Sequence, residues 1–350
     1  MKIFVTGGAG FIGSNFIHCA LSLGKSYRVV NYDKLTYAGN LANLEGIADR
    51  SDYQFVHGDI CDAKKVRASM HGCDAVVHFA AESHVDRSIY EPAPVIKTNV
   101  TGTFTLLEVA HELHMGKFVH VSTDEVYGDM APGESAREDC PLCPNNPYSA
   151  SKAAADLLVR SFVQTYGFPG VITRSSNNYG PYQFPEKFLP LLISNIMENQ
   201  PLPIYGDGQQ ERDWIYVEDH CRAIMEVLER GQVGEVYNIG AGNVRKNVVM
   251  VRAILELLGK LDSPLTYVQD RPGHDRRYSL DCAKIRRELG WRPRIPLEDG
   301  LRRTVAWYQQ SSAWLKSVRD GDYRNYYEKY YLKRDQSLAR IATARGTLAT

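Results

Sequence analysis

Two short polar stretches of the sequence carry side chains that could move protons on a bound substrate. The first is Thr123-Asp124-Glu125, which directly follows an apolar run, 118–121, that predicts a short buried strand. Adjacent carboxyl groups at a buried strand end are costly unless they do chemistry, and each raises the pKa of the other. Such a pair can supply a base for a carbon acid and an acid for a poor leaving group. Because successive strand residues point to opposite faces, both acids meet one substrate only if the strand ends before Asp124.

The second stretch holds Tyr148 and Lys152, which lie four residues apart at the start of a helix predicted over 148–166. Residues with this spacing share one helix face. A free phenol has a pKa near 10, and a neighbouring ammonium group together with a positively charged nicotinamide would lower it. Tyr148 could then accept the proton of a hydroxyl group. Alone, an Asp-Glu or Tyr-x-x-x-Lys pair is more often an ordinary surface feature, so the hypothesis depends on the surrounding elements.

A glycine-rich turn follows the first predicted strand, 2–5, and its glycines at 7, 10 and 13 begin a helix predicted over 11–23. This arrangement is typical of a dinucleotide site, where the backbone approaches a pyrophosphate at the helix N-terminus. Asp33 ends the next predicted strand, at the position expected for a ribose-binding carboxylate. Asp33 would repel a 2′-phosphate, which favours NAD over NADP, although Lys34 beside it would attract one.

Further strands predicted at 54–57, 75–79 and 170–174 alternate with helices, including a long one over 94–114. This order predicts an α/β fold with a doubly wound parallel sheet of Rossmann type, whose strands form a ligand crevice at their carboxyl ends. We expect a smaller C-terminal α+β substrate domain beside it. Loop-like, ligand-binding sequence is predicted over 175–187, 201–208 and 212–214, and small helices and loops over 241–310. The predicted division gives residues 1–176, with 215–240 returning, to an NAD-binding domain, 177–214 and 241–315 to a nucleotide-sugar-binding domain, and 316–350 to a tail expected to be partly disordered.

The composition excludes several classes of function. The chain has 41 basic and 41 acidic residues, so no general field attracts nucleic acid. No apolar run is long enough to span a membrane, and the first residues lack the apolar region and cleavage site of a signal peptide, so we expect none. Seven scattered cysteines fit a reducing, cytoplasmic setting. We interpret Cys140-Pro-Leu-Cys143 as two loop cysteines, because no second ligand pair accompanies it, and expect no metal.

Together, the glycine turn, the Tyr-x-x-x-Lys pair and the strand before it resemble the extended short-chain dehydrogenase/reductase superfamily. Within it, the segments 122–128, 80–88, 176–183 and 271–277 are similar to those of the nucleotide-sugar 4,6-dehydratases, in the same order. The resemblance extends to about residue 315. It implies that dTDP-glucose becomes dTDP-4-keto-6-deoxyglucose, by oxidation at C4, loss of water across C5 and C6, and hydride return to C6. The implied NAD is tightly bound and is regenerated in each turnover.

The resemblance also implies roles for individual residues. Tyr148 and Lys152 would serve the oxidation, Thr123 would hydrogen-bond the C4 oxygen, Glu125 would take the C5 proton, and Asp124 would protonate the departing hydroxyl. Together with the glycine turn and the strand ends, it gives the following cofactor-binding residues: Gly7, Gly10, Phe11, Ile12, Gly13, Asp33, Lys34, Thr36, Asp59, Ile60, Ala80, Ala81, Ser83, Thr98, Tyr148, Lys152 and Asn178. The implied substrate-binding residues are Ser83, Thr123, Asn177, Lys187, Phe188, Pro203, Tyr205, Arg212, Asn247, Arg271 and His274.

Some positions leave alternatives open. Lys246 stands where the family pattern has Thr, which puts the geometry around Asn247 in doubt, and Arg276 and Arg277 are interpreted as a solvated charged face. The two long helices resemble the pair that forms a dimer interface in the superfamily, so we expect a homodimer. A 4-epimerase or decarboxylase on the same fold, or a catalytically silent NAD-sensing protein, would not need the acid Asp124.

Overall fold

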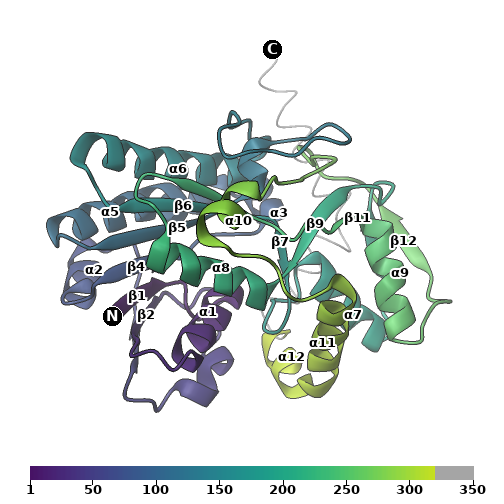
Figure 1. Cartoon of the computed structure of the whole chain (residues 1–350). Coiled ribbons are helices and arrows are strands. Elements are labelled where there is room, and N and C mark those ends of the chain that lie inside the picture. Colours follow the sequence, from purple (N-terminus) through teal and green to yellow (C-terminus); the bar gives the residue numbers. More distant parts are fainter. Residues whose placement is uncertain (320–350) are drawn as a thin grey trace.

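A computed structural model describes residues 1–319, which are built around a parallel sheet of seven strands (Figure 1). The sheet order is β10-β6-β5-β4-β1-β2-β3, and every neighbouring pair is parallel. This confirms the predicted doubly wound fold. The strands are β1 (Lys2–Thr6), β2 (Arg28–Asp33), β3 (Tyr53–His57), β4 (Ala75–His78), β5 (Lys117–Thr123), β6 (Gly170–Ser175) and β10 (Val236–Ile239).

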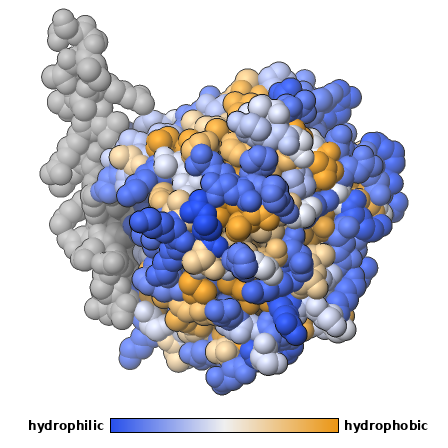
Figure 2. Space-filling model, turned by 90° about the vertical axis from the view of Figure 1, so that its left-hand side faces the viewer, coloured by the Kyte–Doolittle hydropathy of each residue, from blue (hydrophilic) through white to orange (hydrophobic). Residues whose placement is uncertain are grey.

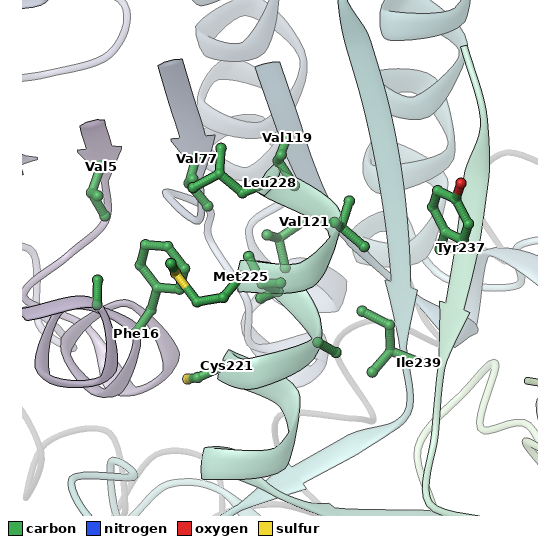
Figure 3. Packing of buried hydrophobic residues seen from close by; sticks show 14 of the residues in the cluster. Val5, Phe16, Val77, Val119, Val121, Cys221, Met225, Leu228, Tyr237 and Ile239 are labelled. Atoms are coloured by element: carbon green, nitrogen blue, oxygen red, sulfur yellow. The ribbon is translucent and has the colours of Figure 1, made fainter. Parts of the chain in front are cut away.

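Helices cover both faces of the sheet. In Figure 3, Phe16 of α1 and Met225 and Leu228 of α8 lie among the buried valines of the strands. Burying such side chains gives about 1.5–3 kcal/mol each, which fixes these two helices on the sheet. The helices α1 (Phe11–Ser22) and α8 (Val217–Arg230) pack together on one face, and α2 (Ala63–Met70), α5 (Thr103–Glu112) and α6 (Pro147–Tyr166) on the other.

The start of α6 is specified locally by its sequence. The Asn146 side chain accepts a 2.9 Å hydrogen bond from the backbone N–H of Ser149, and the Ser149 hydroxyl accepts one of 3.2 Å from the N–H of Asn146. Pro147 occupies the first helical position, where a missing N–H costs nothing. Gly167, with φ of 63°, ends the helix. These caps set the position of Tyr148 in the first turn.

The helix predicted over 94–114 is wrong in its start and in its regularity. It begins at Pro92 and consists of α4 (Pro92–Ile96), a π-helical segment η2 (Lys97–Gly102) and α5. In η2 the Asn99 amide donates to the backbone carbonyl of Glu82 and to the Ser151 hydroxyl, at 3.0 and 2.8 Å. These hydrogen bonds to distant residues stabilise the wide π-helical turn. The spacing of apolar residues in the sequence gives no sign of such a turn.

Two small sheets lie beside the large one, to the right in Figure 1. The predicted loops over 175–187, 201–208 and 212–214 are partly strands, because segments distant in sequence pair there: Asn177 lies opposite Trp214 and Leu202 opposite Leu265. The sheets are β11-β9-β7 and β12-β8, made of β7 (Asn177–Tyr179), β8 (Leu202–Tyr205), β9 (Glu211–Tyr216), β11 (Val244–Lys246) and β12 (Leu265–Val268). The accompanying helices are α7 (Phe188–Met197), α9 (Asn247–Leu257), α11 (Leu297–Gln310) and α12 (Ser312–Val318), and the short ones elsewhere are η1 (Leu41–Ile47), α3 (Val85–Tyr90) and α10 (Ala283–Leu289).

The apolar cores follow this arrangement in part. One cluster joins α7, α9 and α11 to β8 and β9, away from the large sheet. Ile285 and Leu289 of α10, however, pack in the cluster beneath the large sheet, although they fall in the range 241–315. The two-domain division stays a prediction. Residues 316–318 of the predicted tail lie in α12, and those from 320 on lie outside the described residues.

The surface carries apolar patches, and the cysteines are unpaired. Figure 2 shows the face that lies on the left of Figure 1, where hydrophobic side chains form patches among hydrophilic ones. Within residues 1–319, none of the helices combines the length and the apolar character that a membrane crossing requires. All seven cysteines are free thiols, including Cys140 and Cys143.

Candidate active site

A cavity of about 290 Å³ lies at the carboxyl ends of the large sheet's strands. Segments that follow β1 to β6 contribute its walls, as expected for a crevice of this fold. It brings together every residue predicted to bind the cofactor or to act in catalysis. Four of the predicted substrate-binding residues also line it, namely Ser83, Thr123, Asn177 and Lys187.

The glycine turn allows backbone to approach backbone. Gly7 has φ of 70°, and a Cβ atom there would lie 2.6 Å from the Ala80 nitrogen. A Cβ atom on Gly13 would lie 2.2 Å from the carbonyl oxygen of Gly7. Gly10 caps α1 without a side-chain hydrogen bond, and the first turn of α1 holds no acidic residue. The N–H groups at the start of α1 are therefore suited to an anion such as a pyrophosphate.

Asp33 closes the cavity at the end of β2. Its carboxylate accepts hydrogen bonds from the N–H groups of Ala9, at 2.9 Å, and Leu35, at 2.8 Å. Burial raises the pKa of Asp33, and these two N–H groups lower it. The Lys34 ammonium lies 2.8 Å from the Asp59 carboxylate, so the cation beside Asp33 is already paired. These residues fit NAD, and the pairing weakens the argument for a 2′-phosphate.

The chain leaves the strand conformation at the point where the acids require it. β5 ends at Thr123, and Asp124–Tyr127 form a 3₁₀-helix, η3. The Thr123 hydroxyl accepts a 3.3 Å hydrogen bond from the N–H of Glu125 and donates one of 3.2 Å to Oδ1 of Asp124. Asp124 is 3 % exposed, and its Oδ2 has no hydrogen-bond partner in residues 1–319. Both acids line the same cavity, as the end of the strand was predicted to allow.

Burial sets the protonation of the reactive groups. It raises the pKa of Asp124 well above its usual range, and the neighbouring Glu125 raises it further. Burial, Glu125 and Asp124 likewise raise the pKa of the Tyr148 phenol, whereas a hydrogen bond with Thr123 lowers it. Burial lowers the pKa of Lys152 to about 8. Within the protein alone the pKa of Tyr148 is therefore raised, and the lowering expected from Lys152 together with a bound nicotinamide stays a prediction.

Asp156 and Arg174, with His120 beside them, form a buried ionic layer that the sequence did not reveal. Asp156 accepts a 2.8 Å hydrogen bond from Nε of Arg174, and its other oxygen is 3.5 Å from Nε2 of His120. Nη1 of Arg174 donates to the Tyr127 hydroxyl at 2.8 Å. The one available signal was the spacing of Asp156, one helical turn after Lys152.

The remaining predicted substrate residues do not line the cavity, and several gather around Asp86. The Tyr205 hydroxyl donates to Oδ2 of Asp86 at 2.6 Å, and Nη1 of Arg271 donates to Oδ1 at 2.9 Å. The ring of His274 meets that of Tyr205 edge-on, with centroids 6.1 Å apart. The charge of Glu125 contributes to raising the pKa of Arg271. The residues around Asp86 are therefore coupled electrostatically to an acid of η3.

Arg212, Phe188, Asn247 and Pro203 are distributed around the small sheets. Arg212 donates a 2.9 Å hydrogen bond to the carbonyl of Asp275. Burial lowers the pKa of Arg212, and the charges of Glu125 and Asp124 raise it. Phe188 stacks on the indole of Trp214. Oδ1 of Asn247 is buried without a partner in the described chain, and Pro203 lies in β8.

The expected charged face is confirmed at one position and wrong at the other. Arg276 is 52 % exposed and pairs with Asp207. The Arg277 side chain is only 12 % exposed, because it bonds Glu211 and the backbone carbonyls of Ala131 and Glu134.

Other residues that line the cavity were not predicted from the sequence. Glu186 is 2 % exposed and accepts a 3.2 Å hydrogen bond from Nε of Arg87, and only its place before Lys187 could have singled it out. Most of the others contribute backbone or small side chains, for which sequence offers no signal. The missed residues are Tyr32, Ala38, Gly39, Gly58, Phe79, Glu82, Val121, Ser122, Ser175, Ser176, Gln183, Phe184 and Glu186. No group of three or more His, Cys, Asp or Glu within residues 1–319 could hold a metal ion.

Comparison with known proteins agrees with this geometry. The family model described as GDP-mannose 4,6 dehydratase matches residues 4–304. A dTDP-glucose 4,6-dehydratase of Shigella flexneri is 49% identical, over 95% of this chain and 99% of the relative. The dTDP-glucose 4,6-dehydratase DesIV of Streptomyces venezuelae, solved with NAD and a dTDP ligand, is 49% identical with a TM-score of 0.89, over 91% of this chain and 100% of its own. A UDP-glucose 4-epimerase of Thermotoga maritima shares 32% identity with a TM-score of 0.83, over 89% of this chain and 100% of its own.

Proposed function

The chain belongs to the GDP-mannose 4,6 dehydratase family, within the extended short-chain dehydrogenases/reductases, and we propose that it converts dTDP-glucose to dTDP-4-keto-6-deoxyglucose and water. The observation that carries the proposal is the pair of carboxyl groups, Asp124 and Glu125, in one cavity with Tyr148, Lys152 and a dinucleotide cradle. The glycine turn and Asp33 would hold NAD, and the bound cofactor would supply the hydride chemistry that links C4 to C6 of the hexose.

Tyr148 is the base that takes the proton of the C4 hydroxyl, and the Thr123 hydroxyl hydrogen-bonds the C4 oxygen. Lys152 holds a positive charge one turn away on the same helix face. Its ammonium donates a 2.8 Å hydrogen bond to the carbonyl of Val121, which fixes it between α6 and β5. The charge supports the phenolate, against the burial that opposes it.

Water loss across C5 and C6 needs an ionised carboxylate and a protonated one side by side. Glu125 takes the C5 proton, and Asp124 protonates the departing C6 hydroxyl. The raised pKa of Asp124 supports this assignment, because a buried acid beside a second carboxylate keeps its proton. Oδ2 of Asp124, which has no hydrogen-bond partner within residues 1–319, is the atom available to the leaving group.

The nucleotide diphosphate is held by cationic and aromatic groups around the small sheets. Arg212 and Arg271 bind the diphosphate, together with Asn177, Asn247 and His274. Tyr205 stacks on the pyrimidine, in a base pocket completed by Lys187, Phe188 and Pro203. The tether between Arg271, Asp86 and Tyr205 supports this arrangement, because it couples the base pocket to the diphosphate site.

The enzyme acts as a homodimer in the cytoplasm. Support for the dimer comes from large apolar side chains exposed on α4, α5 and α6: Ile96 at 45 %, Phe104 at 38 %, Leu157 at 52 % and Tyr166 at 56 %. Seven free thiols are compatible with a reducing compartment. Residues 1–176 with 215–240 bind NAD, and 177–214 with 241–315 bind the nucleotide sugar. Sedimentation of Leu157→Arg at half the mass of the wild type would agree with the dimer.

The test is incubation of the purified protein with NAD and dTDP-, UDP-, CDP- or GDP-glucose, followed by assay for a 4-keto-6-deoxy sugar. We expect product from dTDP-glucose and slower or no turnover of the others. A C4-inverted sugar as the product would instead assign a 4-epimerase, which does not need Asp124. Absence of any 4-keto-6-deoxy product from all four substrates would refute the proposal, and binding of NAD without turnover would identify a sensor.

A further inference from the structure

The loop that follows β2 is attached at both ends to the dinucleotide site. The N–H of Leu35 donates a 2.8 Å hydrogen bond to the carboxylate of Asp33, where the loop begins. The N–H of Asn40 donates one of 3.0 Å to the carbonyl of Ala9 in the glycine turn, where the loop ends. Between these two points the loop contributes three residues to the wall of the cavity, namely Thr36, Ala38 and Gly39.

Tyr37, which lies among these lining residues, reaches two other segments of the chain. The guanidinium carbon of Arg87 lies over the Tyr37 ring, 3.6 Å from its centroid. The ring of Phe184 meets that of Tyr37 edge-on, with centroids 5.6 Å apart. Nε of Arg87 in turn donates a 3.2 Å hydrogen bond to Glu186, which itself lines the cavity. These contacts join the loop after β2 to the segment that precedes α7.

Arg87 stands on a support that is fixed to the catalytic helix. It lies on α3, where the neighbouring Ser88 hydroxyl accepts a 3.2 Å hydrogen bond from the N–H of Tyr148 at the start of α6. The Glu186 side chain is 1 % exposed, so solvent hardly reaches the acidic side of its ion pair with Arg87. Cation–π contacts and ion pairs are stronger where water is excluded.

We propose that Tyr37, Arg87 and Glu186 form a clasp that retains NAD and has to open before the cofactor enters or leaves. Opening separates the Tyr37 ring from the guanidinium group and moves the loop after β2 away from α3. The contacts join protein groups only, so they are independent of whether the site is filled. A cofactor that ends each reaction in its starting oxidation state needs no exchange with free NAD, and retention keeps every molecule ready for the next substrate. The clasp does not depend on which nucleotide sugar is converted.

The first test is the rate at which Tyr37→Leu releases NAD. Purified protein with bound NAD is mixed with a large excess of isotope-labelled NAD, and the bound nucleotide is isolated at intervals by rapid gel filtration. Loss of a shielded cation–π contact should raise the release rate roughly tenfold. Tyr37→Phe, which keeps a ring for Arg87, should release NAD nearly as slowly as the wild type. Tyr267→Leu is the control, because it removes a tyrosine that is 58 % exposed on β12 and does not line the cavity.

The rate of NAD entry separates a clasp from a simple binding contact. If the clasp must open, Tyr37→Leu should speed entry by about the same factor as release and leave Kd nearly unchanged. Stopped-flow mixing of NAD with protein from which the nucleotide has been washed out measures entry. Faster release with unchanged entry would show that Tyr37 only contributes binding energy. That result, or an unchanged release rate, would overturn the clasp.

A second variant leaves the loop itself untouched. Arg87→Gln removes the charge over the Tyr37 ring but keeps a planar hydrogen-bond donor for Glu186, and it should also speed both entry and release. Adding Tyr37→Leu to Arg87→Gln should give little further acceleration, because the two residues act through one contact. Multiplying effects of the two substitutions would contradict a single clasp. Failure of the wild type to convert dTDP-glucose would refute the dehydratase while leaving these NAD rates, and the clasp, unaffected.

Discussion

Asp124 and Thr123 are sequence neighbours whose side chains hydrogen-bond each other, with 3.2 Å between Oγ1 and Oδ1, at the junction of a strand and a 3₁₀-helix. This contact turns one carboxylate oxygen of Asp124 toward the protein. The other oxygen is buried and unpartnered in residues 1–319. The two carboxylate oxygens of Asp124 thus have different surroundings. A substitution of Asp124 alone tests its role as the acid.

Asp124→Asn should slow water loss and spare oxidation at C4. The amide cannot protonate the departing hydroxyl, and we expect overall turnover to fall by about 10²–10⁴-fold. Hydride transfer should still reduce bound NAD, seen as NADH absorbance after mixing with dTDP-glucose. Glu125→Gln is the matched variant for comparison, because it removes the base that takes the C5 proton in the same elimination of water. Loss of the NADH signal in Asp124→Asn would show that this residue acts before elimination.

Lys152→Met should slow the oxidation step itself. The variant keeps the apolar stem but removes the ammonium group that supports the phenolate, so NADH formation in a single turnover should fall by about 10²–10⁴-fold. Lys117→Met is a suitable control, because it removes another ammonium group hydrogen-bonded to a carbonyl, that of Gly231, at the opposite end of β5. A similar loss of rate in both variants would point to general damage of the strand.

Lys152 also makes stability depend on pH. Burial lowers its pKa to about 8 from the ordinary 10.5. Between these values the unfolded chain binds a proton that the folded chain has lost, so stability rises with pH in this window and is flat below it. Relative to Lys152→Met, the wild type should therefore gain about 1.4 kcal/mol per pH unit from about pH 8 to about pH 10.5. Urea unfolding of both proteins measures this difference, and a pH-independent difference would contradict the lowered pKa.

Gly13→Ala should abolish NAD binding. The added Cβ would lie 2.2 Å from the carbonyl oxygen of Gly7 and 2.8 Å from Cα of Gly8, both backbone atoms, so the turn must shift. Gly46→Ala serves as the control, because a Cβ there meets nothing within 4 Å. Chromatography of the nucleotide released from the purified proteins provides the measurement. Wild-type NAD content in Gly13→Ala would show that the turn does not hold the dinucleotide.

Asp156→Asn should destabilise the fold strongly. It leaves the buried Arg174 guanidinium without its carboxylate, at a cost of about 3–5 kcal/mol in the free energy of unfolding. Asp139→Asn removes the carboxylate of an ion pair whose side chains are 65 % and 71 % exposed, and should change stability by less than about 1 kcal/mol. Denaturant titrations of the two variants provide the comparison. Similar small effects would show that Arg174 is held by Tyr127 and the backbone instead.

The large sheet could be predicted from sequence because its signals are local. The end of β2 at Asp33, the helix α6 and the glycine turn each depend on residues close in the chain. The cofactor cradle followed, because the carboxyl ends of parallel strands meet at one edge. The contact of Asp33 with two backbone N–H groups strengthened an assignment that spacing had already suggested.

The small sheets and the ionic layer could not be predicted, because they depend on distant partners. β8 pairs with β12 some sixty residues later, and neither strand has a strong alternating pattern of its own. Asp156 and Arg174 come from a helix and a strand whose register only the folded sheet defines. The raised pKa of Tyr148 within the protein alone could not be predicted for a related reason: it comes from burial and the two acids of η3, and burial is a property of the packed structure.

The position of β10 has a consequence for synthesis. This strand forms the edge of the large sheet beside β6, and Asn238 within it donates to the carbonyl of Ala136 and accepts from the Tyr127 hydroxyl behind the acids. A chain emerging from a ribosome therefore cannot complete its first sheet until residue 239 has left the exit tunnel. By then the segments of β7, β8 and β9 are already outside, whereas their partner strands β11 and β12 follow later in the chain, so the large sheet can be completed before the two small ones.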